Sequence, residues 1–149
     1  MNLNIILVPV DFSPVTPAIY ETAAALATRM KAAVLVLHVC EKEAEYQQIT
    51  SPAGNTADKA PTGSDVSGHL NEAFAFFKGQ GLTVDTTIRS GEIVSTILAE
   101  ADRRGAGLIV MASHGHGALY SLLVGSTTEG VIRNSKVPVM IVPSKPAAH

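Results

Sequence analysis

Hydrophobic residues in this sequence gather in five short runs separated by longer amphipathic stretches. Four of the runs are almost entirely apolar and rich in β-branched residues, as strands buried on both faces of a parallel sheet are: residues 5–10, 33–39, 108–112 and 137–142. Residues 84–88 alternate polar and apolar side chains, which is typical of a less buried strand. The pattern therefore predicts five strands. Pro9 should lie at the C-terminal end of the first, because proline cannot donate to a sheet ladder.

Apolar residues at helical spacing predict the elements between these strands. One helix should follow Thr16 as N-cap, with Pro17 at its first position. Its core-facing stripe is Ile19, Ala23, Leu26, Ala27 and Met30. A second helix is expected over residues 66–77, with an apolar face made by Leu70, Phe74 and Phe77.

Two further helices are indicated mainly by their ends. Ser90 is a candidate cap for a helix that ends at Gly105, where a C-cap favours positive φ, and its core residues would be Ile93, Ile97, Leu98 and Ala101. The pattern Ser-Thr-Thr-Glu over residues 126–129 is that of a capping box and predicts a short helix through Asn134.

The alternation of strands and helices predicts the fold class. Connections of this kind give a doubly wound five-stranded parallel sheet with helices on both faces, an α/β fold of Rossmann-like type. The 149 residues suit one domain over residues 1–149. Residues 41–68 contain few apolar side chains and many Pro, Gly, Ser and Thr, so we expect a mobile loop there.

Composition narrows the function. Hydrophobic residues make up 46% of the chain and charged ones 16%, which excludes a disordered protein. The net charge of −2 without a basic stripe argues against nucleic-acid binding. The first residues resemble no signal peptide, and no apolar run is long enough to cross a membrane. With a single cysteine, Cys40, interpreted as a small buried hydrophobe, the expected compartment is the cytoplasm.

In open α/β sheets a ligand binds beyond the carboxyl ends of the strands. The residues at those positions are Asp11 and Ser13, then Cys40 and Glu41, then residues 113–117. The last segment is glycine-rich and leads to a helix N-terminus, a combination that can hold phosphate. It is neither a P-loop nor a dinucleotide fingerprint, since the required glycine and lysine spacings do not occur.

The segment MASHGHGALYSLLVGSTTEG resembles the nucleotide motif of the universal stress protein family, G-x2-G-x9-G-[S/T]. Gly115 matches the second glycine, and Gly125-Ser126 match the end of the motif after nine intervening residues. The opening ILVPVDFS and the later LHV are similar to the family's first two strands. One departure is Ala112, which stands at the first motif glycine. We expect Ala112 to be extended, so that its methyl group rather than its backbone conformation affects the ligand.

The resemblance implies a regulatory stress-response protein that binds ATP, ADP or AMP, with Mg²⁺. Asp11 would contact the ribose or adenine end as a buried aspartate, and the backbone at Val39 would pair with the adenine edge. The implied nucleotide-binding residues are Pro9, Val10, Asp11, Val39, Met111, Ala112, Gly115, His116, Gly125, Ser126 and Thr127. The resemblance also implies a homodimer in which strand 137–142 pairs with its two-fold mate.

Several signals have a simpler structural interpretation. Asp11 could cap the first helix, Ser126 is a natural N-cap, and Gly115 could serve only in a turn. His114 and His116 have no neighbouring ligands, so no metal site is predicted. No nucleophile elbow or general base is evident, so we predict no enzyme, with slow ATP hydrolysis left open. The alternative is a family member that binds no nucleotide and acts through dimerisation and protein contacts.

Overall fold

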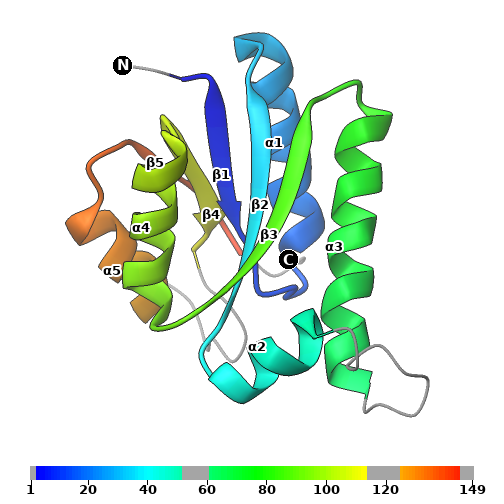
Figure 1. Ribbon diagram of the computed structural model, residues 1–149. Helices are drawn as coiled ribbons and strands as arrows, with labels where there is room; N and C mark the ends of the chain where they lie inside the picture. Colours follow the sequence, from blue (N-terminus) through cyan, green and yellow to red (C-terminus); the bar gives the residue numbers. More distant parts are fainter. Residues whose placement is uncertain (1–2, 52–60, 114–124, 145–149) are drawn as a thin grey trace, which may run out of the picture.

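A computed structural model describes residues 3–51, 61–113 and 125–144, and the side chains of residues 61–64 are also outside the description. Its centre is a parallel five-stranded sheet in the order β3-β2-β1-β4-β5 (Figure 1). The strands are β1 (Ile5–Pro9), β2 (Ala33–Cys40), β3 (Val84–Ser90), β4 (Leu108–Ala112) and β5 (Val139–Val142). The helices are α1 (Thr16–Met30), α2 (Glu43–Thr50), α3 (Pro61–Gly79), α4 (Ile93–Arg104) and α5 (Ser126–Asn134).

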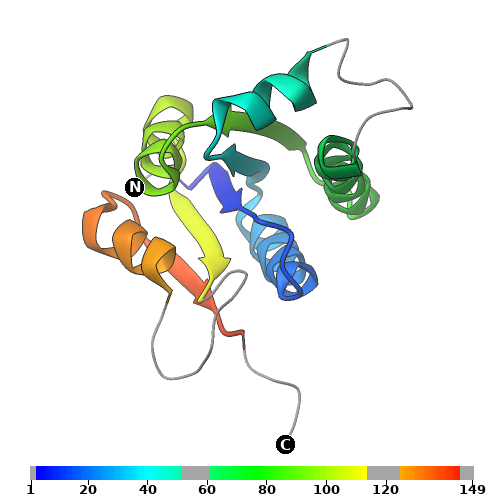
Figure 2. The ribbon, with the colours of Figure 1, turned by 90° about the horizontal axis from the view of Figure 1, so that it is seen from below.

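Helices cover both faces of the sheet, so the predicted fold class is confirmed. Figure 2 shows α1 and α3 on one side of the strands and α4 and α5 on the other. Successive strand residues point to opposite faces. Ile6 and Val8 accordingly join the core beneath α1 and α3, whereas Leu7 joins the core beneath α4 and α5. The two clusters lie back to back across the sheet.

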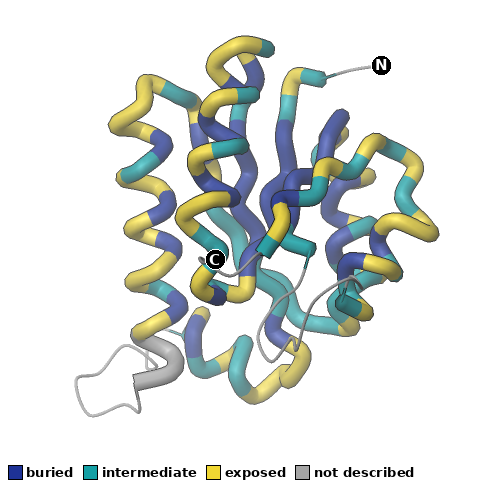
Figure 3. Tube along the Cα trace, turned by 180° about the vertical axis from the view of Figure 1, so that it is seen from behind, coloured by how far each residue is buried: buried dark blue, intermediate teal, exposed yellow. Residues whose placement is uncertain are grey.

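The central strands form the best-buried part of the molecule (Figure 3). Residues 6–8 of β1 and 34–37 of β2 are at most 1% exposed. Strands buried on both faces need apolar residues at every position, which is why their sequence signal was strong. Pro9 lies at the end of β1, as predicted, and it pairs in register with Leu37.

The helix caps differ from the sequence prediction. Thr16 is the first helical residue of α1 and not its cap, because Val15 occupies the N-cap position without a side-chain hydrogen bond. Ser90 does not cap α4 either. Glu92 is the N-cap, and its carboxylate accepts hydrogen bonds from the amides of Val94 (3.1 Å) and Ser95 (2.8 Å). Gly105 ends α4 with φ of 69°, as expected.

The prediction of a loop over residues 41–68 is wrong near both of its ends. Residues 43–50 form α2, and α3 begins at Pro61, while residues 52–60 lie outside the described residues. Helix α2 buries only Ile49. It has acidic residues in its first turn and a hydrogen bond between Gln47 and Glu43 one turn apart, and both features stabilise a helix that has almost no apolar stripe.

Two smaller expectations also change. In α3, Leu70 and Phe77 are buried as predicted, but Phe74 is 42% exposed, and Ala73 takes the buried position beside it. Strand β5 begins at Val139 and not at residue 137. The Val137 amide donates to Ser135 Oγ at 3.1 Å, so this residue belongs to the turn that precedes the strand.

Candidate functional site

The strand register brings three predicted site residues to one level of the sheet. Pro9 pairs with Leu37, and Leu7 pairs with Ile109. Continuing both registers places Asp11 level with Val39 on one side and with Ser113 on the other. Asp11 and Ser113 follow their strands, and Val39 is the last residue but one of β2, so all three lie at the carboxyl edge of the sheet, where ligands bind in this class of fold.

The chain leaves this edge in opposite directions from two neighbouring strands. Strand β1 leads to α1 on one face, and β4 leads to α5 on the other (Figures 1 and 2). Strand order therefore reverses between β1 and β4, and it is at such a switch point that folds of this class bind ligands in a crevice. We call the region beyond the carboxyl ends of β1 and β4 the crevice. The sequence placed its candidate residues on the two sides of this crevice.

The backbone of Val39 faces the β1 side of β2. The Leu37 carbonyl accepts from Val10 N at 2.9 Å, whereas the Cys40 carbonyl accepts from Gly91 N on the β3 side at 3.0 Å. Because backbone groups alternate sides along a parallel strand, the N–H and C=O of Val39 point past the end of β1. This orientation suits pairing with the edge of a planar base.

Asp11 is exposed and does not have the buried position expected for it. Its Oδ1 accepts a hydrogen bond from the amide of Ser13 at 3.1 Å, which forms an Asx turn directly after β1. It does not cap α1, whose N-cap is Val15. The carboxylate thus belongs to the turn at the edge of the crevice.

Phe12, which lies between Asp11 and Ser13, has an unusual backbone conformation. Its φ is 62°, in the left-handed region, which costs a residue with a side chain roughly 1 kcal/mol or more. Its ring stacks on His38 of β2, with centroids 5.0 Å apart, and on His69 of α3, at 4.7 Å. The Nδ1–H of His38 donates to the Val10 carbonyl at 3.0 Å. His38 is therefore a partly buried histidine with a hydrogen-bond partner.

Ala112 is the last residue of β4 and pairs with Val142, so it is extended as expected. Only Phe12 and Lys31 among the described non-glycine residues have positive φ. Alanine in place of the motif glycine therefore causes no backbone strain here. Its carbonyl accepts a hydrogen bond from Thr128 Oγ1 at 2.7 Å, which joins the first turn of α5 to the end of β4.

The start of α5 lies directly beside the end of β4. Gly125 N donates to the Ser113 carbonyl at 2.8 Å, so the two ends of the segment 114–124 are held together. Gly125 is the N-cap, and Ser126 is the first helical residue. The capping box predicted at Ser126 is therefore wrong, because the cap is a glycine without a side chain and Thr128 bonds to β4 instead. Gly115 and His116 lie outside the described residues.

Three of the remaining predicted residues, Pro9, Val10 and Met111, can offer only backbone groups to a ligand. Val10 is 8% exposed and Met111 5%, and their side chains belong to the two core clusters. Pro9 is also buried. By contrast, Ser126 is exposed and Thr127 is half-buried, so their hydroxyl groups remain accessible beside the first amides of α5.

The sequence did not predict that α2 and the end of β3 also contribute to the carboxyl edge of the sheet. Ser90 Oγ donates to Glu43 Oε1 at 2.8 Å, and the hydrogen bonds from Gln47 and Ser90 lower the pKa of the Glu43 carboxyl. Burial and the carboxylates of Glu45 and Glu43 raise the pKa of the Cys40 thiol to about 11. Cys40 is thus a buried, protonated thiol, as predicted. The good helix formers in residues 43–48 were the available signal for α2.

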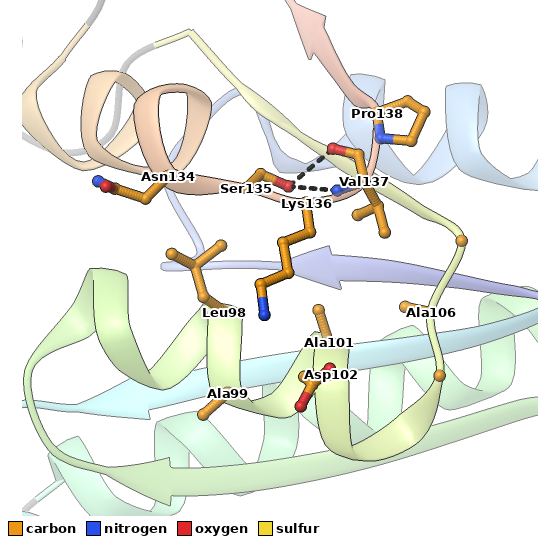
Figure 4. A pocket seen from close by; sticks show the side chains of 12 residues that line it. Leu98, Ala99, Ala101, Asp102, Ala106, Asn134, Ser135, Lys136, Val137 and Pro138 are labelled. Atoms are coloured by element: carbon orange, nitrogen blue, oxygen red, sulfur yellow. Dashed lines mark hydrogen bonds between the residues drawn. The ribbon is translucent and has the colours of Figure 1, made fainter.

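A pocket of about 790 Å³ lies at the opposite, amino end of the sheet (Figure 4). The C-terminal ends of α4 and α5 and the turn before β5 form its walls, and the side chain of Lys136 extends across it. It contains none of the residues that the motif singles out. The carboxyl edge, where the switch point between β1 and β4 lies beside a helix N-terminus, remains the better candidate site.

Known proteins resemble the chain over nearly its whole length. Residues 2–143 match the model of the universal stress protein family. Universal stress protein MJ0577 of Methanocaldococcus jannaschii is 29% identical over 153 residues, which cover 94% of each chain. The solved structure of MJ0577 superposes with a TM-score of 0.80 at 26% identity, covering 99% of this chain and 100% of that one.

Two more distant solved structures contain adenine nucleotides. A universal stress protein in complex with cAMP has a TM-score of 0.69 at 21% identity and covers 95% of this chain and 98% of that one. A universal stress protein from Archaeoglobus fulgidus in complex with dAMP has a TM-score of 0.68 at 19% identity, with coverage of 94% and 97%. At these identities the likeness shows the shared fold.

Proposed function

The chain belongs to the universal stress protein family, and we propose that it is a regulatory member that binds an adenine nucleotide at the carboxyl edge of its sheet. The observation that carries the proposal is the juxtaposition of Asp11, Val39 and Ser113 at one level of the switch point. The cAMP and dAMP complexes of other family members support this class of ligand.

The nucleoside would bind on the β1–β2 side of the crevice. The Asp11 carboxylate is an acceptor suited to ribose hydroxyl groups. The backbone N–H and C=O of Val39 offer one donor and one acceptor side by side, the pairing that an adenine edge requires. This assignment needs no side chain from Val10 or Met111, both of which are buried.

The phosphates would bind at the start of α5. An α-helix has no partners within itself for its first backbone amides. Here the N-cap is Gly125, which has no side chain to accept hydrogen bonds from these amides. The helix dipole adds partial positive charge, and Ser126 and Thr127 supply accessible hydroxyl groups. Because Gly125 is tied to Ser113, this anion site would lie across the crevice from Asp11.

Magnesium would enter with the phosphates. Over residues 3–51, 61–113 and 125–144 no group of three or more His, Cys, Asp or Glu side chains is arranged to hold a metal ion. A resident metal centre is therefore no part of the proposal. Nor is catalysis, since the proposed contacts hold the nucleotide without placing a general base beside its phosphates.

Thermal unfolding with ATP, ADP, AMP and no ligand tests the proposal. A ligand at 100 times its dissociation constant adds about 2.7 kcal/mol to the free energy of unfolding, which for this chain length raises Tm by about 5–15 °C. Gly125→Asp should abolish the shift, because a carboxylate would repel the phosphates. Asp11→Ala should reduce the shift while the fold persists.

Val36→Ala is the control, because Val36 is fully buried in β2 and away from the crevice. This variant should unfold at a lower temperature yet keep the full shift with ATP. Absence of a shift in the wild type at millimolar ATP, ADP and AMP with Mg²⁺ would overturn nucleotide binding. The family member acting only through protein contacts would then be the better description.

A further inference from the structure

We propose that Phe12 is a positioning residue: its ring, stacked on His38 and His69, holds the Asp11–Ser13 turn and thereby orients the Asp11 carboxylate toward the ligand. This inference rests on the proposed nucleotide site. Through His69, helix α3 also contributes to the affinity for a nucleotide at the end of β1.

The backbone of the turn is in a conformation that its sequence does not favour. Phe12 has φ of 62°, although an aromatic residue is a poor choice for the left-handed region. Such a conformation persists only where surrounding contacts impose it, and it is found preferentially at functional sites. Asp11 and Ser13 flank Phe12 directly, so the direction of the Asp11 side chain depends on the same backbone torsions.

Hydroxyl groups do not supply those contacts. The Ser13 and Thr16 hydroxyl oxygens are buried and have no hydrogen-bond partner among the described residues. The turn does contain the bond from the Ser13 amide to Asp11 Oδ1 at 3.1 Å. That bond lies within the turn, and the bond from Thr16 N to the Ser13 carbonyl at 2.9 Å joins the turn to the start of α1.

The rings attach the turn to β2 and α3. His38 is fixed to the end of β1, because its Nδ1–H donates to the Val10 carbonyl at 3.0 Å, and its ring lies 5.0 Å from that of Phe12. His69 contacts the same ring at 4.7 Å from α3, where its Nδ1 is 3.5 Å from Glu72 Oε1. Phe12 therefore bridges a central strand and a helix, and both restrict the turn.

The test measures two quantities in the full chain: the dissociation constant for ATP by calorimetry, and the protection of the Ser13 amide proton against exchange with solvent, by NMR. That proton reports its hydrogen bond to Asp11 whether or not a nucleotide binds. Phe12→Ala and Phe12→Gly should each weaken ATP binding by about tenfold, because a mobile carboxylate must be ordered on binding. In both variants the Ser13 amide proton should also lose its protection against exchange.

Further variants separate ring contacts from backbone strain. Glycine adopts positive φ freely, so wild-type affinity in Phe12→Gly would show that the ring is dispensable. Phe12→Tyr should restore both readouts, and His69→Ala should weaken binding. Lys31→Gly is the control, because Lys31 is the other described non-glycine residue with positive φ, at the C-cap of α1, and its replacement should leave ATP affinity unchanged.

The outcomes separate this inference from the proposed function. ATP binding that is equal in wild type and Phe12→Ala, with unchanged exchange protection of the Ser13 amide, would overturn the positioning role and leave the nucleotide site intact. If the wild type bound no ATP, the nucleotide proposal would fail. Loss of Ser13 amide protection in Phe12→Ala would then still support Phe12 as the residue that holds the turn, and unchanged protection would overturn that too.

Discussion

Glu100 is the one acidic side chain that is buried among the described residues, and it receives hydrogen bonds from two arginines. Its carboxylate, 3% exposed, contacts Arg89 Nε at 2.9 Å and Arg103 Nη2 at 2.7 Å. Burial alone would raise the pKa of this carboxyl, but the hydrogen bonds from Arg103 and Arg89 outweigh burial and lower it. The bond to Arg89 also joins α4 to β3.

We expect the ion pairs of Glu100 with Arg89 and Arg103 to make the free energy of unfolding depend on pH. A carboxyl whose pKa is lowered by folding stabilises the protein above its unfolded pKa, and the contribution disappears as the pH falls through the folded pKa. Glu100→Gln should therefore unfold more easily than the wild type at pH 7, by about 2 kcal/mol. The difference should shrink below about pH 4.5.

Urea unfolding at pH 7, 5, 4 and 3 measures this difference. Asp102→Asn, an exposed carboxylate on the same helix, is the matched control and should follow the wild-type pH profile. A deficit in Glu100→Gln that stays constant from pH 7 to pH 3 would show that the charge of Glu100 contributes nothing to stability.

At the level of single residues, the sequence predicted the backbone conformations that depend only on neighbouring residues. It predicted that Ala112 is extended, because a strand ends there, and that Gly105 has positive φ, because a helix ends there. It did not predict the Asx turn at Asp11 or the left-handed Phe12. Both depend on rings from β2 and α3, which lie 26 and 57 positions away in the sequence.

The contact between helices α4 and α5 depends on a residue without a side chain. A Cβ atom added to Gly130 of α5 would lie 2.8 Å from Val94 Cγ2 of α4. Valine is stiff and cannot turn away easily. Gly130→Ala should therefore lower the free energy of unfolding by about 1–3 kcal/mol through overpacking, despite the higher helix propensity of alanine.

Gly68 of α3 provides the matched control. A Cβ atom there would meet nothing within 4 Å, so Gly68→Ala should stabilise the protein by about 0.5–1 kcal/mol through helix propensity alone. Adding Val94→Ala to Gly130→Ala should recover part of the loss. Stabilisation of the protein by Gly130→Ala in urea unfolding would contradict the close approach of the two helices.

The elements differ in how well the sequence predicted them. Strands β1, β2 and β4 were found almost to the residue, because strands buried on both faces are apolar throughout. Helix α2 was missed because only Ile49 is buried and its other attachment is polar: Glu43 bonds to Ser90, 47 positions further along the chain. No local apolar pattern reports such a contact.

At the scale of the whole molecule, topology followed from connectivity. Alternating strands and helices allow few arrangements, since crossovers between parallel strands are right-handed, and the observed order places the switch point between β1 and β4. That rule brought Asp11 and Ser113 together although 102 positions separate them. The topology of one chain does not determine whether an outer edge of the sheet pairs with a strand of another chain.

Strand β5 forms one of these edges, and we propose that it pairs with the same strand of a second chain. Its four residues, Val139–Val142, contain no charge and no proline to block pairing. An apolar edge of this kind favours association with another strand. Met140 is 37% exposed on β5, and Ile132 is 46% exposed on α5, so apolar surface extends beyond the backbone edge. A two-fold axis would cover both edges with one interface.

Light scattering after size exclusion should give a mass of about twice 15.6 kDa for the wild type. Met140→Asp should shift the protein to the monomer at micromolar concentration, because pairing would bring two like charges close together in an apolar interface. Phe74→Asp is the matched control: Phe74 is 42% exposed on α3, away from β5, and its replacement should leave the dimer intact. A wild-type monomer at high micromolar concentration would refute the interface. Equal dissociation by both variants would show that the contact lies elsewhere than β5.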